Sequence, residues 1–336
     1  MSCKAFLLKK ILIIRFSSIG DIVLTTPVIR AVKNQLGCTI HMLTKSTFAA
    51  IVKNNPNVDK VYSFKSSVRE VIQELKAEKY DHIIDLQKNI RSIRTRRFLG
   101  VPSSSFPKLN IEKWMLVNLK VNRMPDLHIV DRYFEAAEPL GIKSDGEGLD
   151  YFIPEADQVI PEKINPMLKN GYLGIVIGGK HNTKILPAEK VADIINGLDY
   201  PVVLLGGEED RERGDRITEI SHHDKMFNAC GKFNLNQSAS LVNQAKVIIS
   251  NDTGLMHIAA AFRKPVISIW GNTTPLFGMY PFMPGQQNLS IFSEVKDLHC
   301  RPCSKLGYRQ CPKKHFKCMM DQDTEFIVSQ AKRYIT

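Results

Sequence analysis

The chain has 336 residues and a formal net charge of +12, with 43% hydrophobic and 24% charged residues. This composition excludes a disordered or fibrous protein, and the length favours two domains of about 150 residues each over a single core. No apolar run approaches the ~20 residues that a bilayer-spanning helix needs. Lys9 and Lys10 before Ile11–Ile14 resemble the start of a secretory signal, but Arg15 ends the apolar run. A signal needs an apolar run of ~7–15 residues, so we expect a chain that starts near Met1 and stays in the cytoplasm.

The first half of the chain alternates predicted strands with predicted helices. The strands are expected at residues 11–16, 39–43, 58–64 and 82–86, and the helices at 21–36, 48–53, 68–79 and 130–140. Residues 102–128 are expected to be irregular or helical, and the proline- and glycine-rich stretch 145–166 is typical of a linker.

A second alternating series follows that linker. Its strands are expected at 173–177, 202–205, 247–250, 266–270 and 288–292, and its helices at 188–197, 210–221, 235–243 and 253–262. Such alternation predicts parallel sheets covered by helices on both faces. The predicted fold class is therefore α/β with two doubly wound domains, 1–155 and 156–336, whose ligands bind beyond the carboxyl ends of the strands.

The loop after the first predicted strand carries the first chemical signal. It makes a turn at Gly20 and begins a helix at Asp21, without the G-x-G-x-x-G pattern of a dinucleotide site. The helix dipole and nearby N–H groups favour an ionised carboxylate at this position. Asp21 is either a plain helix cap or, if it faces a ligand, a general base for an acceptor hydroxyl.

A basic stretch at residues 86–97 contains no acid. Its cations are Lys88, Arg91, Arg94, Arg96 and Arg97. Such a patch raises the local concentration of anionic partners, although a solvated helical charge run would look the same. Because no nucleic-acid motif accompanies it, we expect no nucleic-acid partner.

Two loops after strands of the second domain contain groups that could bind a nucleotide. Gly178-Gly179-Lys180 and Lys184 follow one strand, where glycine N–H groups and lysines can bind an anion. Glu208 and Glu209 follow the next strand and could accept hydrogen bonds from sugar hydroxyls. As acids at a helix start they could equally complement the helix dipole.

The stretch Asp252–His257 places a helix start directly after a buried strand. Unpaired N–H groups at Thr253 and Gly254, with the positive end of the helix dipole, suit a phosphate or pyrophosphate. His257 lies one turn after Thr253 on about the same face, so it could bind the same anion. The alternative is a capped helix whose histidine packs or points to solvent.

The C-terminal region holds four cysteines, Cys300, Cys303, Cys311 and Cys318, spaced C-x2-C-x7-C-x6-C. Four thiolates could hold a structural zinc ion, but only one C-x2-C pair is present. We therefore expect a loop with free or reversibly paired thiols, and no metal or other cofactor.

Two long motifs resemble glycosyltransferase family 9, the ADP-heptose:lipopolysaccharide heptosyltransferases. The stretch from Ile11 to Pro27 is similar to the opening of that family. The stretch from Ser250 to Ala261, followed by Lys264-Pro265-Val266 and Trp270-Gly271-Asn272-Thr273, is similar to its C-terminal signature. The resemblance covers nearly the whole chain, with both motifs in the family's order and at similar spacing.

The resemblance implies a GT-B fold, two Rossmann-like domains facing across a cleft, in which the C-terminal helix can pack back on the N-terminal domain. It implies inverting, metal-independent transfer of heptose from ADP-heptose to a hydroxyl of the lipopolysaccharide inner core. Asp21 matches the family's general base, and Lys184 matches a lysine that contacts the donor phosphates. The expected donor-binding residues are Gly179, Lys180, Lys184, Glu208, Glu209, Asp252, Thr253, Gly254 and His257; the expected acceptor-binding residues are Ser18, Gly20, Lys88, Arg91, Arg94 and Arg97.

The expected partners are a nucleotide-sugar donor, a phosphorylated lipid A-core acceptor and the anionic inner face of the inner membrane, to which the protein would bind peripherally. Two features depart from the family pattern: Gly178–Lys180 replaces a threonine-rich loop, and Asn272 stands where proline is common. A transferase of the same fold with another nucleotide sugar, or a non-catalytic nucleotide- or polyanion-binding protein, therefore stays open.

Overall fold

The computed structural model describes residues 8–335, which divide into two compact units. The first unit comprises residues up to Lys108 together with Ile129–Phe152, and the second comprises Leu109–His128 and Ile153 onward. The division near residue 152 lies close to the expected boundary at 155. The sequence did not indicate that the segment 109–128 belongs with the second unit.

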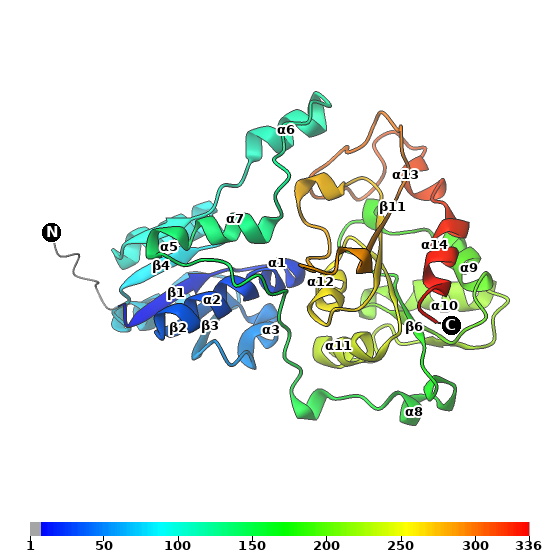
Figure 1. Cartoon of the computed structure of the whole chain (residues 1–336), viewed down its shortest axis with the longest axis horizontal. Coiled ribbons are helices and arrows are strands. Elements are labelled where there is room, and N and C mark those ends of the chain that lie inside the picture. The colour runs from blue at the N-terminus through cyan, green and yellow to red at the C-terminus, as the bar shows by residue number, and fades with distance from the viewer. Residues whose placement is uncertain (1–7, 336) are drawn as a thin grey trace. The chain divides into compact units, whose positions relative to one another are not determined.

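The first unit is a doubly wound α/β unit (Figure 1). Its strands are β1 Lys10–Ile14, β2 Thr39–Lys45, β3 Lys60–Phe64, β4 His82–Asp85 and β5 Ser103–Ser105. Its helices are α1 Ile19–Val23, α2 Thr26–Leu36, α3 Ala50–Lys53, α4 Ile72–Ala77, α5 Ile90–Leu99 and α7 Ile129–Glu135, with 3₁₀ turns η1 Ser46–Phe48, η2 Val68–Glu70 and η3 Glu138–Leu140. All strand pairs are parallel, in the order β3-β2-β1-β4-β5.

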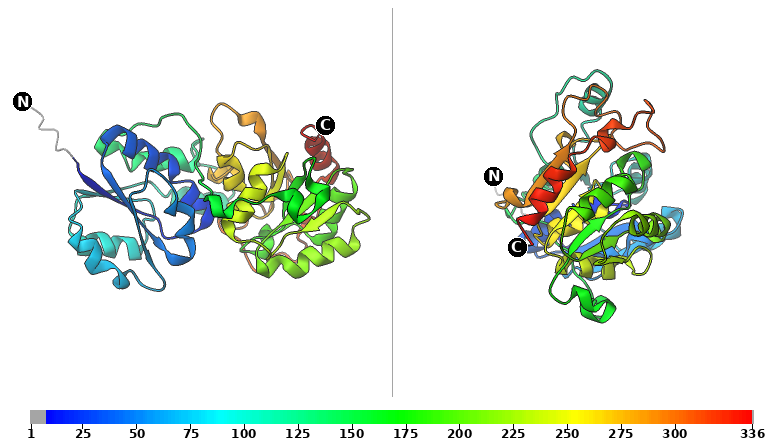
Figure 2. Two further views of the ribbon diagram at one scale, coloured as in Figure 1. Left: turned by 90° about the horizontal axis from the view of Figure 1, so that it is seen from below. Right: turned by 90° about the vertical axis from the view of Figure 1, so that its right-hand side faces the viewer.

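The connections of this sheet place helices on both of its faces. Helix α2 packs against α7, and α4 packs against α5. The left view of Figure 2 shows α2 and α5 on opposite sides of the sheet. The predicted helix 21–36 is in fact two helices, because the chain breaks at Leu24 and Thr25 and restarts with Pro27 in the first turn of α2.

The second unit repeats this plan with six strands. They are β6 Leu173–Val176, β7 Val202–Leu205, β8 Met226–Asn228, β9 Ile248–Asn251, β10 Val266–Trp270 and β11 Ser290–Glu294. Its helices are α6 Asn110–Asn118, α8 Pro161–Ile164, α9 Ala188–Asn196, α10 Arg211–Ile220, α11 Leu235–Gln244, α12 Gly254–Ala261, α13 Lys317–Met320 and α14 Thr324–Lys332. Its 3₁₀ turns are η4 Glu155–Asp157, η5 Pro166–Leu168, η6 Asn182–Lys184, η7 Glu208–Asp210, η8 Pro275–Phe277 and η9 Gln287–Leu289.

The six strands are all parallel, in the order β11-β10-β9-β6-β7-β8. Helices α9 and α10 pack together, as do α11 and α12. The C-terminal helix α14 packs on α9 and β10 of its own unit, with Ile327 and Ala331 in the core. The predicted fold class, two doubly wound α/β units, is confirmed.

The central strands are mostly apolar and buried, because helices cover both faces of each sheet. Ile11–Ile14 of β1 and Val202–Leu205 of β7 are at most 1% exposed. Within residues 8–335, no helix has both the length and the apolar character needed to cross a bilayer.

Candidate functional site

The candidate residues of each unit follow the strands at which its sheet reverses direction. In the first sheet this point lies between β1 and β4, and in the second between β6 and β9. Adjacent loops there leave the sheet toward opposite faces, so the carboxyl ends of these strands form the usual ligand site of doubly wound folds. Asp21 follows β1, Lys88 follows β4, the loop 178–184 follows β6, and Asp252–His257 follows β9.

In the first unit, the carboxylate of Asp21 is held by two neighbours in its own loop. Arg15 Nη2 lies 2.5 Å from Asp21 Oδ1. The backbone N–H and the hydroxyl of Ser18 donate to Asp21 Oδ2 at 3.0 and 2.8 Å. Helix α1 begins at Ile19 with Ser18 as its N-cap, so Asp21 is the third helical residue of a capping box and not the helix start that the sequence predicted. Its carboxylate is held in a fixed orientation, as a base role requires.

Arg15 is itself fixed by a buried network. Its guanidinium donates to the carbonyl of Leu86 at 2.5 Å and to the hydroxyl of Tyr133 at 2.8 Å, and Arg15 is only 7% exposed. Burial by itself lowers the pKa of Arg15, but the charge of Asp21 raises that pKa above its ordinary value. Arg15 therefore remains cationic beside Asp21, a site role that its local sequence did not indicate.

The basic stretch separates into exposed and engaged cations. Arg91, Arg94 and Arg97 are spaced by three on α5 and are exposed. Arg96 pairs instead with the fully buried Asp85, at 3.1 Å. The ammonium group of Lys88 donates a hydrogen bond to the backbone carbonyl of Phe106 at 2.8 Å, which fixes its position within the first unit.

In the second unit, Lys184 and Asp252 meet at the ends of β6 and β9. Lys184 Nζ lies 2.5 Å from Asp252 Oδ2, and the hydroxyl of Thr273 donates to the same oxygen at 3.0 Å. The pair is partly buried, with side-chain exposures of 16% and 14%. Thr273 follows β10, the strand next to β9, so three neighbouring strand ends contribute to this cluster.

The start of α12 lies beside the same cluster. Thr253 caps α12, and a side chain added at Gly179 would contact both Thr253 and Ile185, which places Gly179 against the helix start. The amide of Asn251 donates to the carbonyls of Val176 and Gly178 at 3.2 and 3.3 Å, joining β9 to the loop after β6. Gly254 begins the helix, and His257, one turn on, is 3% exposed.

The acidic turn after β7, η7, holds two exposed carboxylates and one buried carboxylate directly before α10. Glu208 and Glu209 are exposed, and Glu208 pairs with Arg211 at 2.7 Å. The buried acid is Asp210, which accepts from the N–H of Gly207 at 3.0 Å. Burial raises the pKa of Asp210.

Gly178 permits this packing of Asp210, because a Cβ at Gly178 would lie 2.1 Å from Asp210 Oδ2. Lys180 is exposed in the same loop. His181 follows it, and its pKa is lowered by burial and by the charges of Lys184 and Lys180.

The four C-terminal cysteines line one small cavity, together with Asn272 and His315 among others. Their thiols are free, and Cys300 Sγ lies 3.8 Å from His315 Nε2. Across residues 8–335, no three His, Cys, Asp or Glu side chains are grouped as ligands of one metal ion would be. The expectation of free or reversibly paired thiols, rather than a zinc site, stays a prediction.

Arg15, Asp210 and Thr273 were missed as site residues for the same reason. Each acts through a partner that the local pattern does not reveal: Tyr133 for Arg15, Gly178 for Asp210 and Asp252 for Thr273. The only available signal was that each follows a strand at the carboxyl edge of its sheet.

Comparison with known proteins places this chain among sugar-transferring enzymes. The model of glycosyltransferase family 9 (heptosyltransferase) matches residues 68–314. The lipopolysaccharide heptosyltransferase 1 of Campylobacter coli is 24% identical over 292 residues, which cover 79% of this chain and 84% of that protein.

Two solved structures share the fold over nearly their whole length. The structure of the Escherichia coli ADP-heptose lipopolysaccharide heptosyltransferase II matches with a TM-score of 0.72 and 20% identity, covering 97% of this chain and 98% of that one. A glycosyltransferase of family 9 from Veillonella parvula matches with a TM-score of 0.75 and 21% identity, covering 100% and 98%.

Proposed function

The chain belongs to glycosyltransferase family 9, the heptosyltransferase family, and is a glycosyltransferase; from this premise we propose that it transfers heptose from ADP-heptose to a hydroxyl of the lipopolysaccharide inner core. We propose a GT-B arrangement, in which the first unit binds the acceptor and the second unit binds the donor. The named relatives supply the sugar and acceptor class, since they are lipopolysaccharide or lipooligosaccharide heptosyltransferases.

The main structural support for this proposal is that the two units hold groups of opposite charge at equivalent strand ends. The first presents an oriented carboxylate, Asp21, and the second presents Lys184 beside the amide groups at the start of α12. A carboxylate can take a proton from a hydroxyl, and cationic and N–H groups can hold a diphosphate.

In the proposed reaction the acceptor hydroxyl attacks the anomeric carbon from the face opposite ADP, which inverts the configuration. Asp21 accepts the hydroxyl proton as the new carbon–oxygen bond forms. The bond between the anomeric carbon and the β-phosphate oxygen breaks, and ADP leaves with the electron pair.

The groups around α12 would stabilise the charge that grows on the departing phosphate. We assign this role to the amides of Thr253 and Gly254, with His257 nearby and with Gly179 and Lys180 on the facing loop. Lys184 would contact the donor phosphates while Asp252, which accepts a hydrogen bond from Thr273, orients its ammonium group. Because these groups are already cationic or N–H donors, we propose that transfer needs no metal ion.

The remaining assignments follow from exposure. Glu208 and Glu209 lie free of the core at the end of β7, where they could bind the hydroxyls of the donor nucleoside. Ser18 is exposed and Gly20 is buried just before Asp21, so of these two only the Ser18 side chain could reach an acceptor. Arg91, Arg94 and Arg97 offer an exposed cationic face for acceptor phosphates. Lys88 would act there only after release from Phe106.

The proposal is tested by transfer from ADP-heptose to a heptose-deficient lipopolysaccharide core, in buffer containing EDTA. We expect release of ADP and a product whose new linkage has the configuration opposite to that of the donor. Turnover only with another nucleotide sugar would keep the fold and the role of Asp21 but reject the heptosyl donor. Retained configuration would reject the single-displacement mechanism.

A further inference from the structure

The segment 109–128 exposes more large apolar side chains than a covered helix would. Helix α6 turns Leu116 inward, yet Ile111 is 72% and Trp114 is 55% exposed. Leu119, Val121 and Leu127 beyond the helix are also exposed. An apolar group of this kind on the surface marks a site that another surface covers.

A strongly basic loop lies against this segment in the same unit. Lys120 donates to the carbonyls of Cys300 and Pro302 at 3.3 and 2.7 Å, which fixes the end of α6 to the loop 300–317. That loop contains no Asp or Glu. Its exposed cations are Lys305, Arg309, Lys313, Lys314 and Lys317.

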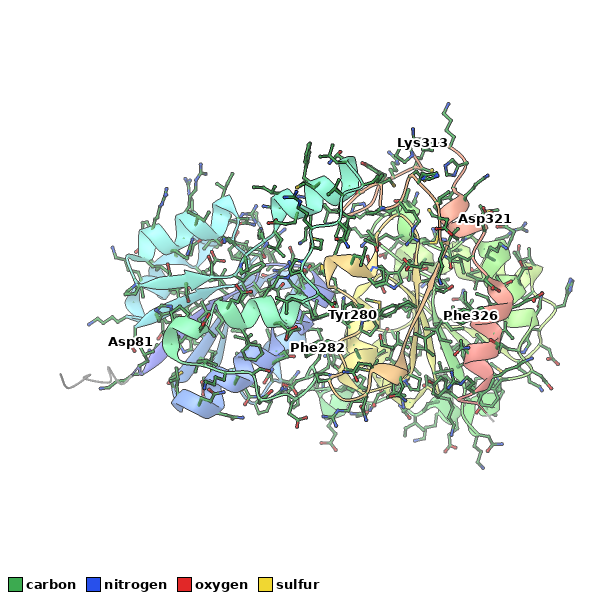
Figure 3. All side chains as sticks on the ribbon, turned by 45° about the horizontal axis from the view of Figure 1, so that its top comes forward. Asp81, Tyr280, Phe282, Lys313, Asp321 and Phe326 are labelled. Atoms are coloured by element: carbon green, nitrogen blue, oxygen red, sulfur yellow. The ribbon has the colours of Figure 1, made fainter. Side chains whose placement is uncertain are left out.

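The loop also carries exposed apolar groups. Leu306 is 61% and Tyr308 is 41% exposed. Figure 3 shows Lys313 pointing away from the body of the protein. We call the exposed residues of 109–128 and of 300–317 together the α6–loop surface.

We propose that the α6–loop surface docks the enzyme on an anionic lipid bilayer. Trp114 and Ile111 would enter the boundary between head groups and acyl chains, where tryptophan is favoured, and the loop cations would lie at lipid phosphates. Each basic residue near an anionic leaflet contributes to binding, and the loop has no acid to oppose this attraction. Lys120 supports the surface through its carbonyl contacts rather than binding lipid.

The combination of charge and apolar groups favours a bilayer over a protein partner. Cations beside exposed Trp, Ile and Leu match an interface that is anionic at the head groups and apolar just below them. Helix α6 has nine residues and does not qualify as a membrane span, so it would lie on the bilayer. The inference extends the proposed function, because a lipid-anchored acceptor resides in a bilayer.

Vesicle binding tests this inference without using the transfer reaction. We expect the protein to sediment with vesicles of phosphatidylcholine mixed with phosphatidylglycerol, and much less with phosphatidylcholine alone. Binding should weaken as salt rises, because salt screens the attraction. Equal binding to both vesicles, or none at low salt, would overturn the proposal, and the second result would favour a protein partner.

Charge variants locate the surface. Lys313→Glu with Lys314→Glu should weaken binding to anionic vesicles by at least roughly 30-fold, from the contribution of two basic residues. The matched control, Lys163→Glu with Lys169→Glu, makes the same charge change at exposed lysines elsewhere in the second unit and should bind nearly as the wild type does. Loss of binding with Arg94→Glu and Arg97→Glu on α5, but not with the loop variant, would move docking to the first unit.

Tryptophan fluorescence tests the insertion itself. The chain has two tryptophans, and Trp270 is only 1% exposed. A blue shift on adding anionic vesicles, with quenching by brominated lipid, therefore reports Trp114 and should vanish in Trp114→Phe. No shift in the wild type while it is bound would contradict insertion.

Transfer to a water-soluble acceptor fragment separates this inference from the proposed function. Ile111→Asp with Trp114→Asp should lose vesicle binding and keep that transfer. Loss of both activities, with circular dichroism unchanged, would contradict a surface that serves docking alone. A wild type that binds vesicles but transfers no sugar would instead reject the proposed function and leave docking standing.

Discussion

The strand-end sites of the two units are built on the same plan but hold opposite ion pairs. In the first, a buried arginine, Arg15, orients the carboxylate of Asp21. In the second, a carboxylate, Asp252, orients the ammonium of Lys184. The sheet topology supplies the position, and the residues that follow the strands determine whether the site offers a base or a cation.

The largest effect should come from removing the base while keeping its shape. Asp21→Asn should lower kcat by ~10²–10⁴, the usual contribution of a general base. ADP affinity, measured by calorimetry, should change little because the donor groups lie in the second unit. Unchanged turnover would leave Asp21 with no role beyond the capping box of α1. Glu74→Gln, the same type of change at an exposed acid on α4, is the matched control.

Arg15 should matter almost as much, but through Asp21. Arg15→Gln leaves Asp21 without its cation and removes the buried hydrogen bonds to Leu86 and Tyr133. It should lower both kcat and the melting temperature, since each buried polar group left unpaired costs ~1–3 kcal/mol. Tyr133→Phe removes one hydrogen bond of the network and should have a smaller effect in the same direction. If Arg15→Gln kept full turnover at a temperature where it is folded, Arg15 would have no positioning role.

Replacing Lys184 should weaken binding of the donor nucleotide rather than change the activation of the acceptor hydroxyl. Lys184→Ala should weaken ADP binding by roughly 10–100-fold, the worth of one charge-assisted hydrogen bond of ~1.5–3 kcal/mol. Thr273→Val, which removes only the hydroxyl bonded to Asp252, should weaken it by a few-fold. Equal ADP affinities for Lys184→Ala and the wild type would remove Lys184 from the donor site.

His181 should produce the smallest effect, a pH dependence of ADP binding. Burial and the charges of Lys184 and Lys180 lower the pKa of His181 below 6.5, so it is neutral at pH 7. A bound diphosphate would stabilise the protonated ring and raise that pKa, so binding would take up a proton.

Because binding takes up a proton, protonation of His181 should strengthen ADP binding as pH falls below about 6.5. Because ADP itself also titrates, the quantity to measure is the ratio of the dissociation constants of His181→Gln and the wild type between pH 7.5 and 5.5. That ratio should increase on acidification, and a constant ratio would place His181 away from the donor phosphates.

Much of the fold could be predicted because most of its strands are short, continuous runs of mainly apolar residues. Val202–Leu205 and Val266–Trp270 were predicted with their observed bounds. The edge strand Met226–Asn228 was missed, since three residues show no periodicity. The segment 109–128 was uncertain for another reason: its apolar groups stay exposed, so no buried face marks the helix.

The candidate site was predictable where a motif follows a strand and unpredictable where two distant segments meet. Asp21 and Lys184 were identified from their own loops. The partner of Arg15, Tyr133, lies 118 residues away along the chain, and the exposure of Glu208 and Glu209 beside the buried Asp210 depends on packing against Gly178. Contacts between segments that lie far apart in the chain cannot be inferred from the local sequence.

The decisive measurement asks whether the second unit binds the donor nucleotide while the first unit supplies the base. It is calorimetric titration of the wild type and of Asp21→Asn with ADP, GDP and UDP, without added metal. We expect both proteins to bind ADP with nearly equal affinity and to bind GDP and UDP much more weakly. Binding of none of the three by the wild type, or ADP binding that depends on Asp21, would contradict this expectation.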